Sequence, residues 1–303
     1  MGTLLPVGAR VDQTIFGLGL CVVDEAYCVS GAPADERTRY RERVVGPGGM
    51  VANALLQVAA LGGRAELISL VGDDAAGRWL LRTLRQRGVG TRRVLRSPDF
   101  ATTRALILVD AATGERRFVL PERASRERRV PAFSLSALRA NSVLMVDGHF
   151  PHQAQVALET ARARGAITMA DFARLDPAFE GMWPSVDYPV VPRSFVDSAN
   201  LGSPREVLRW LRERSGGTPV VTLGSDGALA LVEGRFRRIR PHRVAVRDTT
   251  GAGDAFHGAL ASGLSRGLPI LAALDLASRA GAFACRALGA TSSLLSPRDV
   301  NTA

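Results

Sequence analysis

Short apolar runs alternate along this chain with longer stretches that have helical spacing. Residues 15–23, 67–71 and 143–146 are apolar runs of strand length, whereas residues 50–61 place their apolar side chains near one face of a helix. Strands that alternate with helices form βαβ units, in which the strands are parallel and helices cover the sheet. The sequence therefore predicts an α/β fold, and 303 residues suffice for one large domain with or without an appendage.

Two segments interrupt this alternation. Residues 104–110 and 115–120 flank an Ala-Ala-Thr-Gly turn and predict a hairpin, and residues 26–30 also have the composition of a strand. We expect these segments to form a small antiparallel appendage to the main sheet. The other expected elements are strands at 166–169, 186–191 and 220–223, helices at 153–164, 255–265 and 270–288, and a hairpin over 228–239.

All 39 basic residues are arginines, and the formal net charge is +10. The lack of lysine excludes a lysine-containing P-loop, a Schiff-base lysine and the phosphate-binding lysine of protein kinases. A positive charge of this size suits an anionic small substrate or a nucleic acid. The densest run, residues 116–129, is interrupted by Glu122 and Glu127 and has no nucleic-acid recognition motif. We expect a solvated basic surface and an anionic ligand, and no nucleic acid.

The cysteine pattern, the first ten residues and the lack of a long apolar stretch indicate the cellular compartment that we expect for this protein. Cys21, Cys28 and Cys285 are odd in number and form no Cys-x-x-Cys, so neither a disulfide framework nor a thiolate zinc site is expected. The first ten residues lack the pattern of a signal peptide, and no apolar stretch approaches the roughly 18 residues of a membrane span. We expect a soluble, cytoplasmic protein without a membrane partner.

Polar side chains follow several of the expected strands. Asp24 comes after the first strand, Asp147 and His149 after the strand at 143–146, and Asp171 after the strand at 166–169. Each alone could be a loop carboxylate or a helix cap. Because ligands bind outside the carboxyl ends of parallel strands, their convergence on one sheet edge predicts a site.

The segment Asp248-Thr-Thr-Gly-Ala-Gly-Asp254 stands directly before an apolar helix. Gly251 and Gly253 let the backbone turn tightly and bring amides close to a ligand. The unpaired amides of the first helical turn and the helix dipole favour an anion such as a terminal phosphate. Asp254, beside these amides, could accept a proton from a substrate hydroxyl. The alternative is a simple turn followed by a capping carboxylate.

A second glycine-rich segment, Gly46-Pro-Gly-Gly-Met-Val-Ala-Asn53, opens the first long helix. Gly48 and Gly49 let a substrate approach the backbone. Asn53 lies one turn inside an apolar helix, where its propensity is unfavourable. A ligand rich in hydroxyl groups explains this asparagine better than a satisfied buried amide does.

The chain resembles the PfkB/ribokinase family of sugar and nucleoside kinases from residue 16 to residue 300. The matching blocks occur in the family's order, and the last is its most specific signature: residues 19–24, 48–53, 71–77, 221–227 and 248–254. The resemblance implies a single domain over residues 1–303, built as an αβα sandwich. It also implies a β-sheet lid at about 24–45 and 102–122, which in relatives often serves as a dimer interface.

The resemblance further implies roles for individual residues. Asp254 would be the catalytic base, and Gly251, Ala252, Gly253 and the Asp254 amide would form the anion hole. The residues that would hold sugar hydroxyls are Asp24, Gly48, Gly49 and Asn53. Those that would lie along ATP, the phosphoryl donor that carries magnesium, are Thr222, Gly224 and Gly227.

One block departs from the family pattern. Many relatives carry Asn-x-x-Glu where this chain has Pro192-Arg-Ser-Phe195, so the residues that would organise Mg²⁺ are not identified. This departure, with the segment Val146-Asp-Gly-His149, resembles the ketohexokinase and sulfofructose-kinase branch more than ribokinase.

Four further residues have open roles. Arg104, on an expected lid strand, could contact an anionic substituent of the sugar or be a solvated edge charge. His149 and His152 lack a third metal ligand, and His149 could bind a substrate hydroxyl. His257, one turn after Asp254, could support that aspartate or lie on the helix surface.

The sequence thus predicts an ATP-dependent kinase that phosphorylates a hydroxymethyl group of a ketose, a furanose or a sugar acid. A nucleoside kinase of the same fold is the alternative, although the expected lid offers few aromatic side chains for a nucleobase. A dinucleotide-dependent oxidoreductase is disfavoured because Gly17-Leu-Gly-Leu-Cys-Val22 lacks the third glycine. The intact Gly-Ala-Gly-Asp argues against a non-enzymatic sugar sensor. The identity of the sugar, the oligomeric state and any monovalent-cation activation stay open.

Overall fold

The computed structural model describes residues 13–31, 38–121, 132–140 and 142–301. Within these residues, nine strands form one sheet. In chain order they are β1 (Thr14–Leu18), β4 (Arg64–Gly72), β5 (Val89–Ser97), β8 (Val143–Asp147), β9 (Ile167–Asp171), β10 (Tyr188–Pro192), β11 (Val220–Thr222), β12 (Ala228–Val232) and β13 (Arg235–Ile239). Across the sheet the order is β13-β12-β11-β10-β9-β8-β1-β4-β5. The strands from β11 to β5 are parallel, and β12–β13 adds an antiparallel hairpin.

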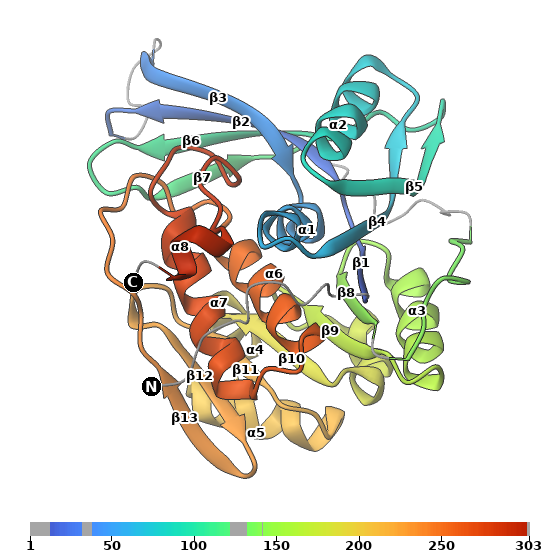
Figure 1. The fold of residues 1–303 in the computed structure, drawn as a ribbon. Helices are drawn as coiled ribbons and strands as arrows, with labels where there is room; N and C mark the ends of the chain where they lie inside the picture. Colours follow the sequence, from blue (N-terminus) through green and yellow to red (C-terminus); the bar gives the residue numbers. More distant parts are fainter. Residues whose placement is uncertain (1–12, 32–37, 122–131, 141, 302–303) are drawn as a thin grey trace.

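Helices cover both faces of this sheet (Figure 1). On one face lie α1 (Met50–Ala60), α2 (Ala75–Gln86), α6 (Ala252–Ser265) and α7 (Ile270–Ala284); on the other lie α3 (Pro151–Ala163), the 3₁₀ helix η1 (Pro177–Ser185), α4 (Arg193–Ala199) and α5 (Pro204–Ser215). Successive strand residues alternate between the two cores, as Ile15 and Phe16 do. Two short helices, η2 (Gly224–Asp226) and α8 (Pro297–Asn301), complete the set. The predicted αβα sandwich is confirmed.

A second sheet of four strands, which we call the lid sheet, stands beside the first (Figure 1). Its strands occupy the segments in which the lid is expected: β2 (Val22–Val29), β3 (Tyr40–Gly48), β6 (Arg104–Asp110) and β7 (Arg116–Val119), in the order β3-β2-β6-β7. The prediction that these strands form an antiparallel appendage is wrong in one respect, because β2 and β6 are parallel. Both enter the lid sheet from the carboxyl end of a parallel strand, β1 and β5 respectively, so they run in the same direction.

The residue register gives the lid sheet two distinct faces. Asp24 pairs with Ala105 and Ala26 with Ile107, and these side chains are all buried against the main domain. Their sequence neighbours Glu25 and Leu106 point to the opposite face, because side chains alternate along a strand. The inner face of the lid sheet therefore carries Asp24.

Other sequence expectations differ in detail. The apolar run at 15–23 is not one strand, because β1 ends at Leu18 and β2 begins only at Val22. Gly19 lies in the interruption and packs closely against Asp147, since a Cβ there would lie 2.1 Å from Oδ2 of Asp147. The expected helix at 270–288 ends at Ala284. Helix α5 was not expected, although Ser203 and Glu206 form a capping box at its start. None of the described helices combines the length and the apolar character that a membrane crossing requires.

Candidate active site

The segment before α6 forms an open cradle of backbone amides. Gly251 is the N-cap with φ 78°, and a Cβ there would lie 2.4 Å from the carbonyl oxygen of Ala290, so only glycine fits. A Cβ on Gly253 would meet nothing within 4 Å, so this side of the turn is open to a ligand. Within the described part of the chain, the amides of Gly253 and Asp254 have no acceptor. The cradle can therefore receive an anion.

Asp248 holds this cradle in place. Its carboxylate is fully buried and accepts hydrogen bonds from the backbone amides of Thr250 (2.8 Å) and Gly289 (2.7 Å). The Thr250 hydroxyl also donates to it, at 2.6 Å. The first aspartate of the motif thus positions the loop from inside the protein.

Asp254 and Asn53 meet at the mouth of the cradle. The Asn53 amide Nδ2 donates to Asp254 Oδ2 at 2.8 Å, although the two residues are 201 positions apart. Asn53 is 3% exposed, and its Oδ1 has no hydrogen-bond partner within the described structure. Burial raises the pKa of Asp254, and the Asn53 hydrogen bond, followed by the charges of His257 and Arg116, opposes that rise. The arrangement leaves one buried amide oxygen without a hydrogen-bond partner among the described residues.

Asp24 lies against the second glycine segment. A Cβ on Gly48 would lie 2.1 Å from Cγ of Asp24, and a Cβ on Gly49 would lie 2.1 Å from the carbonyl oxygen of Leu20. Gly49 also has a φ of 93°. Both glycines are therefore required by the protein's own packing at this point. Asp24 is 8% exposed, and burial, with the charges of Asp254 and Asp248, raises its pKa to about 7.

The carboxylates that end β8 and β9 lie in the same region. Asp147 accepts hydrogen bonds from the backbone amides of Leu20 (3.0 Å) and His149 (2.9 Å), so it ties β8 to the end of β1. Burial raises the pKa of Asp171 to about 6; the charge of His257 lowers this value, whereas those of Asp254 and Asp147 raise it further. Carboxylates from β2, β8, β9 and α6 thus form one coupled cluster.

His257 is buried inside this cluster, so it does not lie on the helix surface. The side chain is 3% exposed, and Nδ1 lies 2.8 Å from the carbonyl oxygen of Gly253. Nε2 lies 3.3 Å from the Val190 carbonyl oxygen and 3.6 Å from Asp171 Oδ2. Both ring nitrogens face oxygen acceptors, and the ring links the cradle to the ends of β9 and β10.

The predicted nucleotide residues lie farther along the same sheet edge. Thr222 ends β11, where it pairs with Pro192. Gly224 has a φ of 62° and no atom within 4 Å of a Cβ, so its surroundings are open. Gly227 is enclosed, since a Cβ would lie 2.1 Å from the carbonyl oxygen of Ile239. These residues are separated from β8 by β9 and β10.

Two arginines of the lid sheet lie on opposite faces of that sheet. Arg104 lies on the face of the lid sheet opposite Asp24, where its Nη1 is 3.1 Å from Glu25 Oε1. The structure does not bring it together with the other predicted substrate residues. Arg116, which sequence reasoning missed, donates from Nη1 to the Thr249 hydroxyl at 2.7 Å. Its position at the start of a hairpin strand gave no indication of which face it occupies.

Residues 13–297 match the model of the pfkB family carbohydrate kinase. The chain belongs to the PfkB family of carbohydrate kinases. It is 31% identical over 285 residues to the aminoimidazole riboside kinase of Salmonella typhimurium, with 84% of this chain and 87% of the relative covered. It is also 31% identical over 284 residues to a fructokinase of Salmonella typhimurium, with 84% and 91% covered. The crystal structure of ribokinase from Thermotoga maritima superposes with a TM-score of 0.79 at 25% identity, with 95% of this chain and 98% of that chain covered.

Membership in the PfkB family confirms three of the sequence predictions. The fold is ribokinase-like, the chain is a phosphotransferase with an alcohol group as acceptor, and it is an ATP-dependent carbohydrate or nucleoside kinase. The relatives include a riboside kinase and a fructokinase at equal identity. The two relatives therefore do not distinguish a sugar from a nucleoside as the acceptor of this PfkB kinase.

Proposed function

We propose that this PfkB kinase transfers the γ-phosphoryl group of ATP to a hydroxymethyl group of a sugar, with Asp254 as the base. The observation that carries this proposal is the contact between Asp254 and Asn53 beside an open amide cradle. A hydroxyl that donates to the free Oδ2 lone pair or to Oδ1 of Asp254 would face a phosphoryl group held by the cradle.

The chemistry requires one proton transfer and one bond exchange. Asp254 takes the proton of the acceptor hydroxyl, and the resulting oxygen attacks the γ-phosphorus as the bond to the β-phosphate oxygen breaks. The amides of Ala252, Gly253 and Asp254 would stabilise the charge on the transferring group. ADP then leaves with the electrons of the broken bond, and the proton on Asp254 passes to solvent.

The sugar side of the site is proposed at the lid. Asp24 and the Oδ1 atom of Asn53 are buried acceptors that converge on Asp254. Each suits a hydroxyl donor, which supports a polyhydroxylated acceptor. A side chain at position 48 would collide with the Asp24 carboxylate, so the glycine there leaves this carboxylate its place.

The nucleotide side is proposed over β10 and β11. Thr222 ends β11, which β10, β9 and β8 separate from β1 in the sheet, and the turn at Gly224 is open. The triphosphate would then run from this turn toward the cradle at α6. Gly227 serves the turn's own packing, so its proposed contribution is to shape the loop along the nucleotide.

Magnesium has no ligand cage in the described residues, where no group of three or more histidine, cysteine, aspartate or glutamate side chains could hold a metal ion. At the position of the family's Asn-x-x-Glu, Arg193 instead pairs with Asp226 at 2.6 Å. We propose that Mg²⁺ arrives on the triphosphate, whose oxygens and bound waters suffice for octahedral coordination. We assign it no protein ligand.

A homodimer through the lid sheet is supported by the outer face of that sheet. Leu106 and Val119 are adjacent across β6 and β7 and are 38% and 57% exposed, and Val45 on β3 is also exposed. An exposed apolar row on a sheet fits a self-complementary interface. A cytoplasmic location is proposed because ATP is the donor and Cys21, Cys28 and Cys285 are all free thiols.

The test combines one variant with a panel of acceptors. Asp254→Asn keeps the shape of the side chain, and we expect unchanged ATP binding with kcat about 10²–10⁴-fold lower. Wild-type turnover by this variant would remove Asp254 from the role of base.

The acceptor panel contains fructose, ribose, a sugar acid, adenosine and cytidine, with ADP formation as the readout. We expect turnover with a sugar. Turnover with the nucleosides alone would show that the acceptor is a nucleoside and not a sugar.

A further inference from the structure

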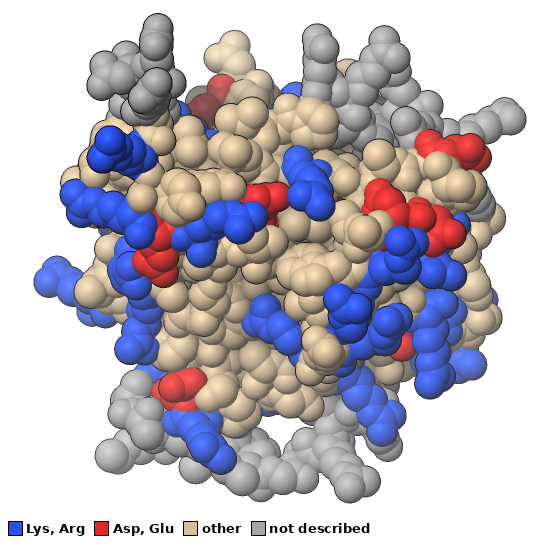
Figure 2. Space-filling view, turned by 90° about the horizontal axis from the view of Figure 1, so that it is seen from above, with Lys and Arg blue, Asp and Glu red and all other residues tan. Residues whose placement is uncertain are grey.

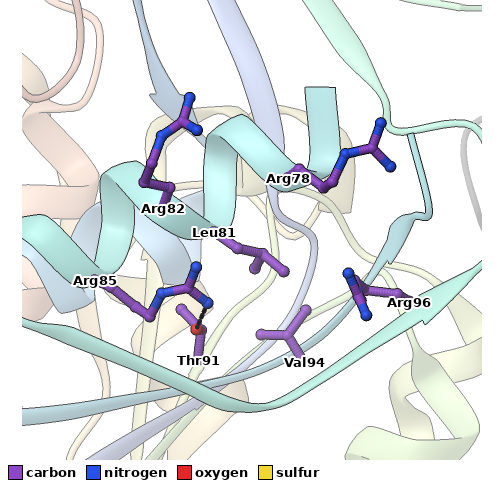
Figure 3. Close-up of a pocket in the computed structure, with 7 residues that line it drawn as sticks. All are labelled: Arg78, Leu81, Arg82, Arg85, Thr91, Val94 and Arg96. Carbon is purple, nitrogen blue, oxygen red and sulfur yellow. Dashed lines mark hydrogen bonds between the residues drawn. The ribbon is translucent and has the colours of Figure 1, made fainter. Parts of the chain in front are cut away.

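A cavity of about 490 Å³ lies between α2 and the edge strand β5. Four arginines surround it: Arg78, Arg82 and Arg85 from α2, and Arg96 from β5. Figure 3 shows Leu81 and Val94 facing each other between the helix and the strand, as an apolar floor. We call this space the arginine cavity. It shares no residue with the active site described above.

Local structure brings these arginines together. On α2, residues 78, 82 and 85 follow one stripe of the helix, because neighbours three and four positions apart lie on the same face. On β5, the pairing with β4 shifts, so that Gly90 to Arg93 spans three steps where Glu66 to Ile68 spans two. Such a bulge changes which side chains face the helix. It allows Thr91 and Val94 to line the same cavity.

The positive charge of the cavity is only partly neutralised. Asp73 lies 3.6 Å from both Arg78 and Arg96, so one carboxylate serves two guanidinium groups. Within the described residues, no carboxylate lies within 4.0 Å of Arg82 or Arg85. Arg85 instead donates to the hydroxyl of the buried Thr91 at 3.3 Å, which turns its guanidinium toward the cavity (Figure 3).

Without a bound anion, this arginine cluster destabilises helix α2. Like charges three and four positions apart repel each other, and Arg78 lies near the N-terminus of α2, where the helix dipole disfavours a cation. The edge strand β5 carries Arg92, Arg93 and Arg96 of its own, so protection of that edge does not explain the three further arginines on the helix. In Figure 2, arginine side chains gather on the side of the molecule where α2 and β5 lie in Figure 1.

We propose that the arginine cavity binds a small organic anion that carries two phosphate groups. Guanidinium groups bind phosphate in a bidentate manner, and Arg85 at one end and the Arg78–Arg96 pair at the other can each take one group. The apolar floor of Leu81 and Val94 suits the carbon skeleton between them. The cavity volume lies within the range of small-molecule sites. The proposal does not depend on the acceptor of the kinase.

Pyrophosphate is the probe, titrated by isothermal calorimetry into the full-length protein at fixed low salt. Because the amide cradle at α6 can also bind pyrophosphate, the comparison is between variants. Arg85→Gln/Arg96→Gln removes two cavity charges. Arg235→Gln/Arg237→Gln removes two exposed charges from β13 and is the matched control.

We expect one binding event to weaken at least tenfold in the cavity variant and to be unchanged in the control. Orthophosphate, with one group, should bind the same site at least tenfold more weakly than pyrophosphate. Equal isotherms for wild type and the cavity variant would overturn the proposal. Equal weakening in both variants would do so too, because it would show a response to net charge alone.

Unfolding of the cavity variant would also abolish binding. A second pair of variants, each with a single substitution, is therefore included. Arg82→Glu reverses an exposed charge at the rim and breaks no hydrogen bond that the described structure contains, and Arg235→Glu is its control. The thermal midpoint of each is measured without ligand. Loss of pyrophosphate binding in Arg82→Glu with an unchanged midpoint supports the site; retained affinity contradicts it.

Discussion

Asp24 should make the free protein less stable as the pH rises. In the unfolded chain an aspartate ionises near pH 3.8, whereas burial and the charges of Asp254 and Asp248 raise the pKa of Asp24 to about 7 in the folded chain. Between these two values the folded state holds a proton that the unfolded state releases. Stability attributable to this group therefore falls as the pH rises from about 4 to about 7, and it is lowest above pH 7.

The size of the effect follows from the two pKa values. Their difference is about three, and each unit corresponds to about 1.4 kcal/mol, so ionised Asp24 costs about 4 kcal/mol of unfolding free energy above pH 7. Because the side chain is only 8% exposed, solvent screening reduces this value little. Asp24→Asn keeps the shape and removes the charge. We expect the variant to gain stability over wild type at pH 8, by up to about 4 kcal/mol, and little at pH 4.

The assay is thermal and urea unfolding of wild type and Asp24→Asn at pH 4, 6 and 8 without ligand. The control is Asp197→Asn, which replaces an exposed aspartate on α4. The KM for the sugar should rise in Asp24→Asn although the fold is more stable. A stability difference between Asp24→Asn and wild type that does not change with pH would refute the reasoning.

Four further outcomes are expected. Asn53→Ala should raise the KM for the sugar more than that for ATP, and equal losses would identify a purely structural amide. His257→Gln and Arg116→Gln each remove a positive charge that lowers the pKa of Asp254. The acid limb of the plot of kcat against pH should therefore move to higher pH, by about one pH unit for each unit by which the pKa rises. An unmoved limb would show that neither charge acts on the base. Leu106→Glu should convert the dimer to a monomer in light scattering, and a wild-type mass would place the interface elsewhere.

Local motifs in the sequence were sufficient to predict the glycine turns at the starts of α6 and α1. The anion cradle follows from Gly251, whose positive φ and close approach to Ala290 only glycine tolerates. The same holds for Gly49, at the start of α1. In both cases a glycine-rich turn precedes a helix, and the positive φ at that turn is a local requirement that the sequence motif reveals.

Residues placed by tertiary packing could not be assigned in this way. Arg104 and Arg116 both lie in the predicted hairpin, and the face of each depends on the register with β2, which enters the lid sheet four residues after β1 ends. Because we expected one unbroken strand at 15–23, the sequence did not indicate where β2 begins, and its register with β6 could not be predicted. His257 shows the same limit, since its partner carbonyl on Val190 is 67 positions away. No helical pattern around His257 distinguishes a buried ring from an exposed one.

The acidic centre has a chemical consequence beyond binding. A general base works best when its pKa lies near the operating pH, since it must be ionised and still accept a proton. At Asp254, burial raises the pKa, and Asn53, His257 and Arg116 lower it. Arg116 belongs to the lid sheet, so any movement of the lid that broke its hydrogen bond to Thr249 would also withdraw a charge from the base. Seating of the lid sheet against the cradle is thereby linked to ionisation of Asp254, the form that its proposed role as a base requires.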